Sequence, residues 1–224
     1  MKKLPIYETF YSWQGEGCHA GKSAFFIRLF GCPVKCPWCD SAGTWHPDFI
    51  PEKVDKLSVH ELVQQAKAHN PEIVVITGGE PSIHDLSELT CALHEAGLTI
   101  HLETAGTHPI RGSFDWITLS PKVWKLPLDE NLALANEFKI IVDEPGAIDH
   151  WESTLGKQLG NRPVWLNPEW LVSSEPEILA AINSKVKERR FSYRAGFQLH
   201  KLYAVDEEDP RSKPVSELRI QASK

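Results

Sequence analysis

Residues 31–40 read GCPVKCPWCD and place three cysteines, Cys32, Cys36 and Cys39, within eight residues. The C-x3-C-x2-C spacing directly follows an apolar run from Phe25 to Phe30, which predicts a β-strand. Three thiolates in one loop can hold three corners of a cubane iron–sulfur cluster, whose potential depends on its ligands, hydrogen bonds and exposure. The fourth iron would then be open to a small molecule. The spacing therefore predicts a 4Fe-4S site with three protein ligands.

Two other uses of these cysteines have to be weighed. Zinc also accepts Cys3His ligation, and His46 lies seven residues beyond Cys39. Zinc sites usually combine two separated ligand pairs, however, and no second C-x2-C or H-x3-H pattern follows. A disulfide framework is disfavoured because five cysteines in 224 residues are few and odd in number. A structural zinc site remains the main alternative at this point.

Composition and charge narrow the class of protein. Of the 224 residues, 42% are hydrophobic and 24% are charged, so one large domain can bury a substantial core. The net charge of −6 argues against a broad nucleic-acid surface, so we expect no nucleic-acid partner. The first ten residues lack the apolar core of a secretory signal, and no run approaches the length of a membrane span. With unpaired thiols, these features predict a cytoplasmic protein with no membrane contact.

Short apolar runs alternate with helix-period runs along the chain, which predicts parallel strands with helical crossovers. Helices are indicated by the capping box Ser58-Val59-His60-Glu61 and by two apolar stripes. One stripe contains Leu86, Leu89, Leu93 and Ala96 and ends at Gly97; the other contains Ile178, Leu179, Ile182 and Val186. The expected strands are 24–30, 73–77, 99–104, 116–120, 138–142, 164–167 and 197–200.

Eight-stranded barrels typically need about 250 residues, and this chain offers six or seven strands. We therefore expect an α/β fold in which a shortened, partly open parallel (β/α) barrel occupies residues 1–205. Residues 206–224 are polar and contain prolines, so they are expected to form a tail. Cys18 is expected to be a loop thiol, and Cys91 is expected to lie on a helix and face the core.

Candidate functional residues follow several expected strands, where the loops of parallel α/β folds converge. The strand at 73–77 runs into Thr77-Gly78-Gly79-Glu80-Pro81, whose paired glycines let the backbone approach a ligand closely, although a plain turn would read the same way. The Arg28 guanidinium, just before the cysteines, suits bidentate capture of a carboxylate or a structural ion pair. Other strand ends carry Glu103-Thr104, Ser120-Pro121-Lys122, Asn167-Pro168-Glu169 and Gln198-Leu199-His200-Lys201.

The order of these motifs resembles the radical S-adenosylmethionine superfamily and, in detail, the 7-carboxy-7-deazaguanine synthase family. The superfamily resemblance rests on the cysteine triad followed by Gly78-Gly79-Glu80. The family resemblance spans about residues 5 to 204 and adds Gln14-Gly15-Glu16-Gly17, Arg28, Asp40-Ser41, Glu103-Thr104, Ser120-Pro121-Lys122 and Gln198-Leu199-His200-Lys201.

This resemblance implies a lyase that contracts the ring of 6-carboxy-5,6,7,8-tetrahydropterin to give 7-carboxy-7-deazaguanine with loss of ammonia. The product lies on the route to queuosine and other 7-deazapurines. The implied cofactors are a 4Fe-4S cluster, S-adenosylmethionine and Mg²⁺. The implied partners are an electron donor such as flavodoxin or ferredoxin and a second copy of the chain in a homodimer.

The resemblance also assigns roles to residues of this chain. Cys32, Cys36 and Cys39 would hold the cluster, and Ser41 would hold Mg²⁺, although threonine is common there in the family. The pterin would contact Trp13, Gln14, Gly15, Arg28 and Thr77. S-adenosylmethionine would contact Trp38, Cys39, Asp40, Gly79, Ser120, Pro121, Lys122, Asn167, Pro168, Glu169 and Trp170. Asn167 stands where glutamine is common, which weakens that one assignment.

Two alternative functions remain. A glycyl-radical enzyme activase has the same cysteine spacing, but it acts on a partner polypeptide and would have little use for Arg28 or Ser41. A zinc-binding module with no enzymatic activity would need only the thiols and a fourth ligand.

Overall fold

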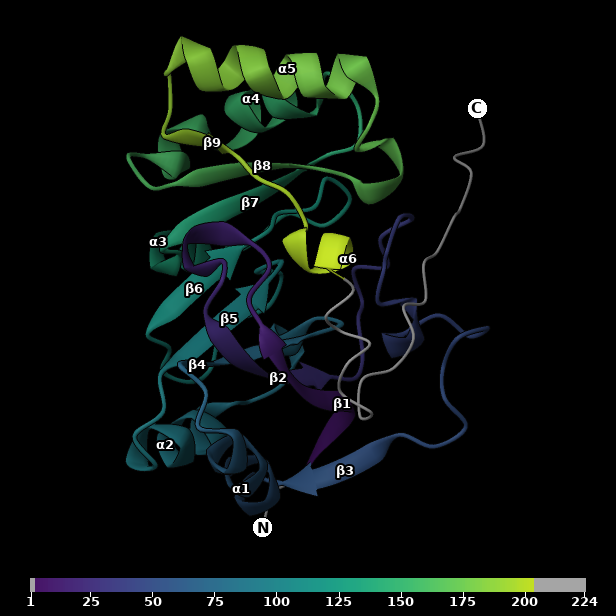
Figure 1. Ribbon diagram of the computed structural model, residues 1–224, viewed down its shortest axis with the longest axis vertical. Helices are drawn as coiled ribbons and strands as arrows, with labels where there is room; N and C mark the ends of the chain where they lie inside the picture. Colours follow the sequence, from purple (N-terminus) through teal and green to yellow (C-terminus); the bar gives the residue numbers. More distant parts are fainter. Residues whose placement is uncertain (1–2, 204–224) are drawn as a thin grey trace.

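The computed structural model describes residues 3–203, which fold around one curved sheet of nine strands (Figure 1). The order across the sheet is β3-β1-β2-β4-β5-β6-β7-β8-β9. Seven strands, β2 and β4 to β9, run parallel, whereas β1 lies antiparallel between β2 and β3. The strands are β1 (Lys3–Trp13), β2 (Ser23–Leu29), β3 (Asp55–Ser58), β4 (Ile73–Gly78), β5 (Ile100–Thr104), β6 (Trp116–Leu119), β7 (Glu137–Val142), β8 (Val164–Pro168) and β9 (Tyr193–Ala195).

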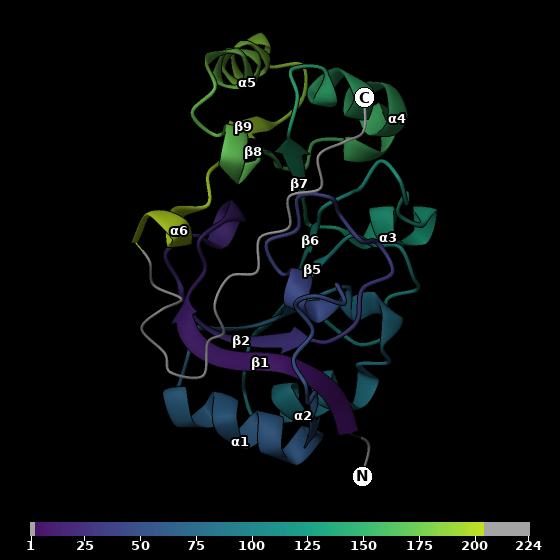
Figure 2. The same ribbon diagram turned by 90° about the vertical axis from the view of Figure 1, so that its right-hand side faces the viewer.

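Helices cover the outer face of this sheet in two groups (Figures 1 and 2). One group, α1 (Val59–His69) and α2 (Ser87–Glu95), packs on the half that contains β2, β4 and β5. The other group, α3 (Asp129–Leu134), α4 (Ala147–Leu159) and α5 (Pro176–Glu188), packs on β6 to β9. The open, mostly parallel sheet confirms the expected shortened and partly open barrel.

Two apolar clusters hold these layers together. Leu62 of α1 and Leu89 of α2 belong to the first cluster, and Trp151 of α4 and Ile182 of α5 belong to the second. Alternate residues of each strand point to opposite faces of a sheet, so the strand residues in these clusters face outward. The residues between them face the inside of the curved sheet, where the polar groups described below lie.

The helix signals in the sequence formed as expected. At the start of α1, the Glu61 backbone N–H donates to the Ser58 hydroxyl at 3.3 Å, and the Ser58 N–H donates to the Glu61 carboxylate at 2.7 Å. This reciprocal pair is the capping box. Gly97, just beyond α2, has a φ of +77°, which favours glycine over other residues at a helix end.

The open side of the barrel is covered by a hairpin tip and a short helix rather than by paired strands. One is the tip of the β1–β2 hairpin (residues 14–22), and the other is the short helix α6 (Leu199–Tyr203), which lies beside it (Figures 1 and 2). The Leu199 N–H donates to the Gly15 carbonyl at 3.2 Å. The hairpin tip also reaches β7, because the Cys18 N–H donates to the Glu137 carboxylate at 2.9 Å. Gly17 permits that contact, since a Cβ there would lie 2.5 Å from Glu137 Oε1.

Three expectations from the sequence are wrong. The strand expected at 197–200 is displaced: β9 ends at Ala195, and α6 begins at Leu199. The chain leaves the sheet at Gly196, where a Cβ would collide with the buried Asn167 side chain. Cys91 is exposed on α2, with its sulfur 3.6 Å from Glu95, instead of lying in a core. Leu179 is also exposed, so it is not part of the packed stripe of α5.

The sequence reading also missed β1 and β3, the two strands that pair antiparallel. The expected boundary between a barrel domain at 1–205 and a polar tail at 206–224 lies outside the described residues. None of the helices described within residues 3–203 has the length and apolar character needed to cross a bilayer.

Candidate active site

A cavity of about 270 Å³ lies inside the curved sheet, at the carboxyl ends of its parallel strands. Its wall is built by the cysteine loop after β2, Gly78 and Gly79 at the end of β4 and the segments that follow β5, β6 and β8, together with the hairpin tip and α6. The structure brings into this one wall the following residues selected from the sequence: Trp13, Gln14, Gly15, Arg28, Cys32, Cys36, Trp38, Cys39, Asp40, Ser41, Thr77, Gly79, Ser120, Lys122, Pro168, Glu169 and Trp170.

Pro121 and Asn167 were selected too, but they are buried behind the wall. The Asn167 side chain donates to Glu16 Oε1 at 2.8 Å, so it supports a lining residue from behind.

The three cysteines lie in an apolar nest with Val34, Ala105 and the Trp38 ring. Burial raises the pKa of Cys36 to about 12 and that of Cys39 to about 11, and burial raises the pKa of Cys32 as well. Thiols in such a place stay protonated unless a metal takes the thiolate form. All three are free: Cys36 is buried, and Cys32 and Cys39 are partly buried on the cavity wall. The donor set and its surroundings therefore fit an iron–sulfur cluster.

Gly79, the first residue after β4, has a structural role beside the cysteine loop. A Cβ on Gly79 would lie 2.3 Å from the Gly31 carbonyl oxygen and 2.9 Å from the Cβ of Cys32. The Glu80 N–H donates to that same carbonyl at 2.9 Å. Only a residue without a side chain lets the end of β4 approach the cysteine loop so closely.

Glu80 is almost fully buried, and its carboxylate binds the neighbouring strand end. Oε2 accepts the Ala105 N–H at 2.7 Å, and Oε1 accepts the Thr104 hydroxyl and, at 3.0 Å, the Ser82 N–H. Glu80 thus ties the end of β4 to the end of β5 and does not face a ligand through a free oxygen pair.

Lys122 provides a partly buried positive charge near the cysteines. Its ammonium donates to the carbonyl and the hydroxyl of Ser120, at 2.7 and 2.8 Å, and lies 5.7 Å from the Trp38 ring centre. Burial lowers the pKa of Lys122, which means that the charged form lacks full compensation. A ligand carboxylate at this position would supply the missing negative charge.

Arg28 faces the cavity from β2 and connects two other groups there. Its Nε donates to Glu8 at 2.6 Å, and its Nη1 donates to the Ser41 hydroxyl at 3.1 Å. The Ser41 hydroxyl in turn donates to Asp40 Oδ1 at 3.2 Å. A hydroxyl beside a carboxylate is the kind of oxygen pair that suits Mg²⁺, so these residues fit that ion.

Asp40 is the point where the cysteine loop meets α6. Gln198 Nε2 donates to Asp40 Oδ2 at 3.3 Å, and Lys201 Nζ lies 3.5 Å from the same oxygen. Burial would raise the pKa of Asp40, but the charges of Lys201 and Arg28 outweigh it and lower that pKa to about 2. Asp40 is therefore ionised and held from both sides.

The wall of the cavity also carries a ring of charged and amide groups, in which Lys139 is the member that the sequence analysis did not select. Lys139 Nζ lies 2.7 Å from Glu16 Oε2 and 2.9 Å from Glu103 Oε2. Gln14 completes the ring, because its Nε2 donates to Glu103 Oε1 at 3.1 Å and its Oε1 accepts the Glu16 N–H at 3.2 Å. The sequence does contain a sign that Lys139 is unusual, because it is the one charged residue in the apolar run 138–142.

Opposite charges set the protonation of this ring. Burial would lower the pKa of Lys139, but Glu103 and Glu16 outweigh it and raise that pKa, so the ammonium stays charged. The pKa of Glu16 is lowered despite burial, mainly by Lys139, whereas burial raises the pKa of Glu103. Two carboxylates thus share one ammonium on the cavity wall.

Among residues 3–203, no three His, Cys, Asp or Glu side chains converge on a single metal ion, and this holds for the three cysteines as well. The imidazole of His46 instead accepts the Asp48 N–H at 3.4 Å. Nothing in this part of the chain favours the Cys3His zinc alternative.

An open parallel barrel with three free cysteines after its first parallel strand defines the class of protein. Residues 26–124 match the family model described as the Radical SAM superfamily. A Synechocystis protein named 7-carboxy-7-deazaguanine synthase is 46% identical over 208 residues, which cover 90% of this chain and 93% of the relative. A Flavobacterium psychrophilum protein of the same name is 36% identical over 88% of this chain and 90% of its own length.

A solved structure agrees with these relatives. The crystal structure of QueE from Escherichia coli matches with a TM-score of 0.76 and 33% identity, and the match covers 88% of this chain and 95% of that one. The chain belongs to the 7-carboxy-7-deazaguanine synthase family.

Proposed function

We propose that this chain is a lyase that converts 6-carboxy-5,6,7,8-tetrahydropterin into 7-carboxy-7-deazaguanine, with loss of ammonia, in the biosynthesis of queuosine and other 7-deazapurines. One observation carries the proposal. A single cavity joins the cysteine nest to a second region that holds Arg28, Ser41 and the hairpin tip. A cofactor and a carboxylated substrate can therefore lie side by side, which favours reaction between them.

The cysteine side of the cavity suits the cofactors. Cys32, Cys36 and Cys39 would hold a 4Fe-4S cluster, and Lys122 with Ser120 would hold the carboxylate of S-adenosylmethionine. When bound, the cluster and S-adenosylmethionine together supply a 5′-deoxyadenosyl radical that takes a hydrogen atom from the substrate.

The remaining cofactor contacts follow from the same arrangement. Trp38, Asp40 and Gly79 would line the cofactor on the strand ends near the cysteines, and Pro168, Glu169 and Trp170 would line it from the segment after β8. Pro121 would act from behind the wall, between Ser120 and Lys122, and Asn167 would act indirectly through Glu16, which it holds.

The other side of the cavity suits the pterin. Arg28 is held by Glu8, so its guanidinium is fixed for capture of the substrate carboxylate. Ser41 would coordinate Mg²⁺ together with that carboxylate, and the neighbouring Asp40 adds negative charge for the ion. Trp13, Gln14, Gly15 and Thr77 would shape the space for the pterin rings.

Three finer points belong to the same proposal. The five free thiols of Cys18, Cys32, Cys36, Cys39 and Cys91 support a reducing compartment, the cytoplasm. A small one-electron carrier such as flavodoxin or ferredoxin would reduce the cluster. The family resemblance supports a homodimer, which sedimentation of the purified protein would test.

Anaerobic turnover tests the function directly. Protein reconstituted with iron and sulfide should convert the tetrahydropterin substrate to the deazaguanine acid in the presence of S-adenosylmethionine, a reductant and Mg²⁺, as measured by mass spectrometry. Cys36→Ala should abolish both turnover and the visible absorbance of the cluster. Cys91→Ala, a change at an exposed thiol of α2, is the matched control and should affect neither. Stoichiometric zinc with no iron, or no pterin product, would refute the proposal.

A further inference from the structure

Lys139 stands at the centre of the hydrogen-bonded ring on the cavity wall. Each of its two partners receives a second bond: Glu103 from Gln14 at 3.1 Å and Glu16 from Asn167 at 2.8 Å. Both carboxylates are thus fixed in orientation from two sides. Their side chains are only 11% and 15% exposed, so what remains accessible faces the cavity that they line.

The ring leaves a defined set of groups for a ligand. An ammonium has three N–H donors, and two of those of Lys139 are used by Glu16 and Glu103. The third donor is available to a molecule in the cavity, and it lies between carboxylate oxygens that accept hydrogen bonds. A matching ligand edge has a carbonyl oxygen next to N–H groups.

The substrate of the proposed function has such an edge. A pterin carries an amino group, a ring N–H and a ring carbonyl on its pyrimidinone ring, on the side away from its 6-carboxylate. Arg28 and Ser41 offer a site for that carboxylate elsewhere in the same cavity. The ring around Lys139 and the site at Arg28 and Ser41 would bind opposite ends of one molecule.

We propose that Lys139 determines specificity for the pyrimidinone ring: its third N–H binds the ring carbonyl oxygen, and its charge holds Glu16 and Glu103 ready for the ring N–H groups. This inference rests on the proposed function, and it adds a role to a residue that no motif in the sequence singles out. Because a hydrogen bond from a charged donor inside a cavity contributes more than a neutral one, its loss should weaken pterin binding by about 10- to 100-fold.

The test compares two ligands in the cluster-loaded protein, with S-adenosylmethionine present and reductant absent, so that binding is measured without turnover. One ligand is the natural tetrahydropterin acid, and the other is its analogue with an amino group in place of the ring carbonyl. The wild-type protein should prefer the carbonyl compound. Lys139→Met should bind that compound about 10- to 100-fold more weakly and lose most of the preference, while its affinity for S-adenosylmethionine stays unchanged.

Two further variants separate specificity from folding. Lys139→Arg keeps the charge and should retain part of the preference. Lys139→Met leaves two buried carboxylates without a cation, so the double variant Lys139→Met/Glu16→Gln provides a version with less unpaired charge. It should fold, load its cluster and show the same loss of preference.

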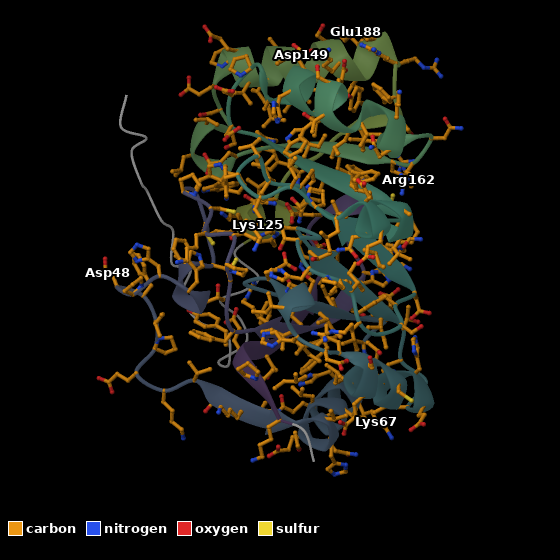
Figure 3. The ribbon with its side chains drawn as sticks, turned by 180° about the vertical axis from the view of Figure 1, so that it is seen from behind. Asp48, Lys67, Lys125, Asp149, Arg162 and Glu188 are labelled. Carbon is orange, nitrogen blue, oxygen red and sulfur yellow. The ribbon has the colours of Figure 1, made fainter. Side chains whose placement is uncertain are left out.

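Lys185→Met is the matched control. Lys185 also joins two carboxylates, Asp149 at 2.6 Å and Glu152 at 3.1 Å, but it lies on α5. Figure 3 shows its neighbours Asp149 and Glu188 at the end of the molecule that α4 and α5 cover. The control should keep the full preference. An unchanged preference in Lys139→Met would overturn the inference even if the wild-type enzyme turns over, whereas absence of wild-type turnover would count against the proposed function itself.

Discussion

Lys201 Nζ lies 3.5 Å from Asp40 Oδ2, and this contact joins α6 to the loop that carries the three cysteines. Lys201 also lies 5.1 Å above the Trp170 ring, so one side chain connects the cysteine loop, α6 and the segment after β8. Asp40 itself is flanked by Cys39 and Ser41, both of which have proposed ligand roles. The position of α6 and the geometry of the metal-binding loop are therefore linked.

Replacing Lys201 by Gln tests that link. The contact lies at the rim of the cavity, so its loss should change the free energy of unfolding by about 1 kcal/mol or less. Hydrogen exchange should nevertheless become faster in both α6 and residues 39–44, because each holds the other in place, and turnover should fall. The exposed Lys187 of α5 provides the control, Lys187→Gln, with no change in exchange at either segment. Faster exchange in α6 alone would contradict the link.

Gly79→Ala should damage the cysteine loop. The added Cβ would lie 2.3 Å from the Gly31 carbonyl, a backbone atom that cannot move without shifting Cys32. Overpacking of this kind costs about 1–3 kcal/mol, so we expect a lower thermal midpoint and less iron per chain after reconstitution. Gly146→Ala, at a position with no atom within 4 Å of the added Cβ, should leave the iron content unchanged. Normal iron loading in Gly79→Ala would show that the loop tolerates the shift.

Arg28→Ala should impair pterin binding far more than binding of S-adenosylmethionine. The guanidinium bridges Glu8 and the Ser41 hydroxyl, and its removal leaves the Glu8 carboxylate buried without that partner. We expect the KM for the pterin to rise by about 10-fold or more, the loss typical of a charged hydrogen bond. Equal weakening of both ligands in equilibrium binding would mean that Arg28 shapes the whole cavity instead.

Stability should fall in mild acid because of His101. This imidazole is buried beside His19, 4.4 Å away between ring centres, and burial lowers its pKa from 6.5 to about 4. Between these two values the unfolded chain binds a proton that the folded chain excludes, so the free energy of unfolding decreases as the pH falls. The full effect is about 3 kcal/mol.

Chemical denaturation at pH 7, 6 and 5 measures this slope. His101→Gln keeps a polar side chain but removes the titrating group, so its curve should be flatter than that of the wild type. A smaller slope in the same direction should remain in His101→Gln, because burial also lowers the pKa of His19. Parallel curves for the two proteins would rule out His101 as the source.

Much of the wall of the cavity was predictable from the sequence because of the alternation of residues along strands. In β2 the outward positions are Phe25, Ile27 and Leu29, so Arg28 had to face the inside of the barrel. The cysteine loop and the glycines followed from the rule that parallel strands end at a common edge. Six of the seven expected strands appear where they were expected, within two residues at each end.

The missed features depend on contacts between distant segments. The role of Lys139 depends on its contact with Glu16, which is 123 positions away, and no local sequence pattern predicts that pair. The strand β1 contains Pro5 and Glu8 among its apolar residues, so its pattern was mixed. It forms a strand by pairing antiparallel with β2, and Glu8 is accommodated by its salt bridge with Arg28 of β2. The segment 197–200 was expected to be a strand, but the described sheet ends with β9 and the chain turns out of it at Gly196, just before α6.

The way in which the barrel is closed has a consequence for ligand exchange. Two strands that pair along their whole length can separate only when many backbone hydrogen bonds break together. Here the cover on the open side, α6, is attached to the hairpin tip by the bond from Leu199 to Gly15 and by side-chain contacts such as that of Trp13 with Tyr203. Displacing α6 would therefore break these few contacts and that of Lys201 with Asp40, but no hydrogen bond between strands of the sheet.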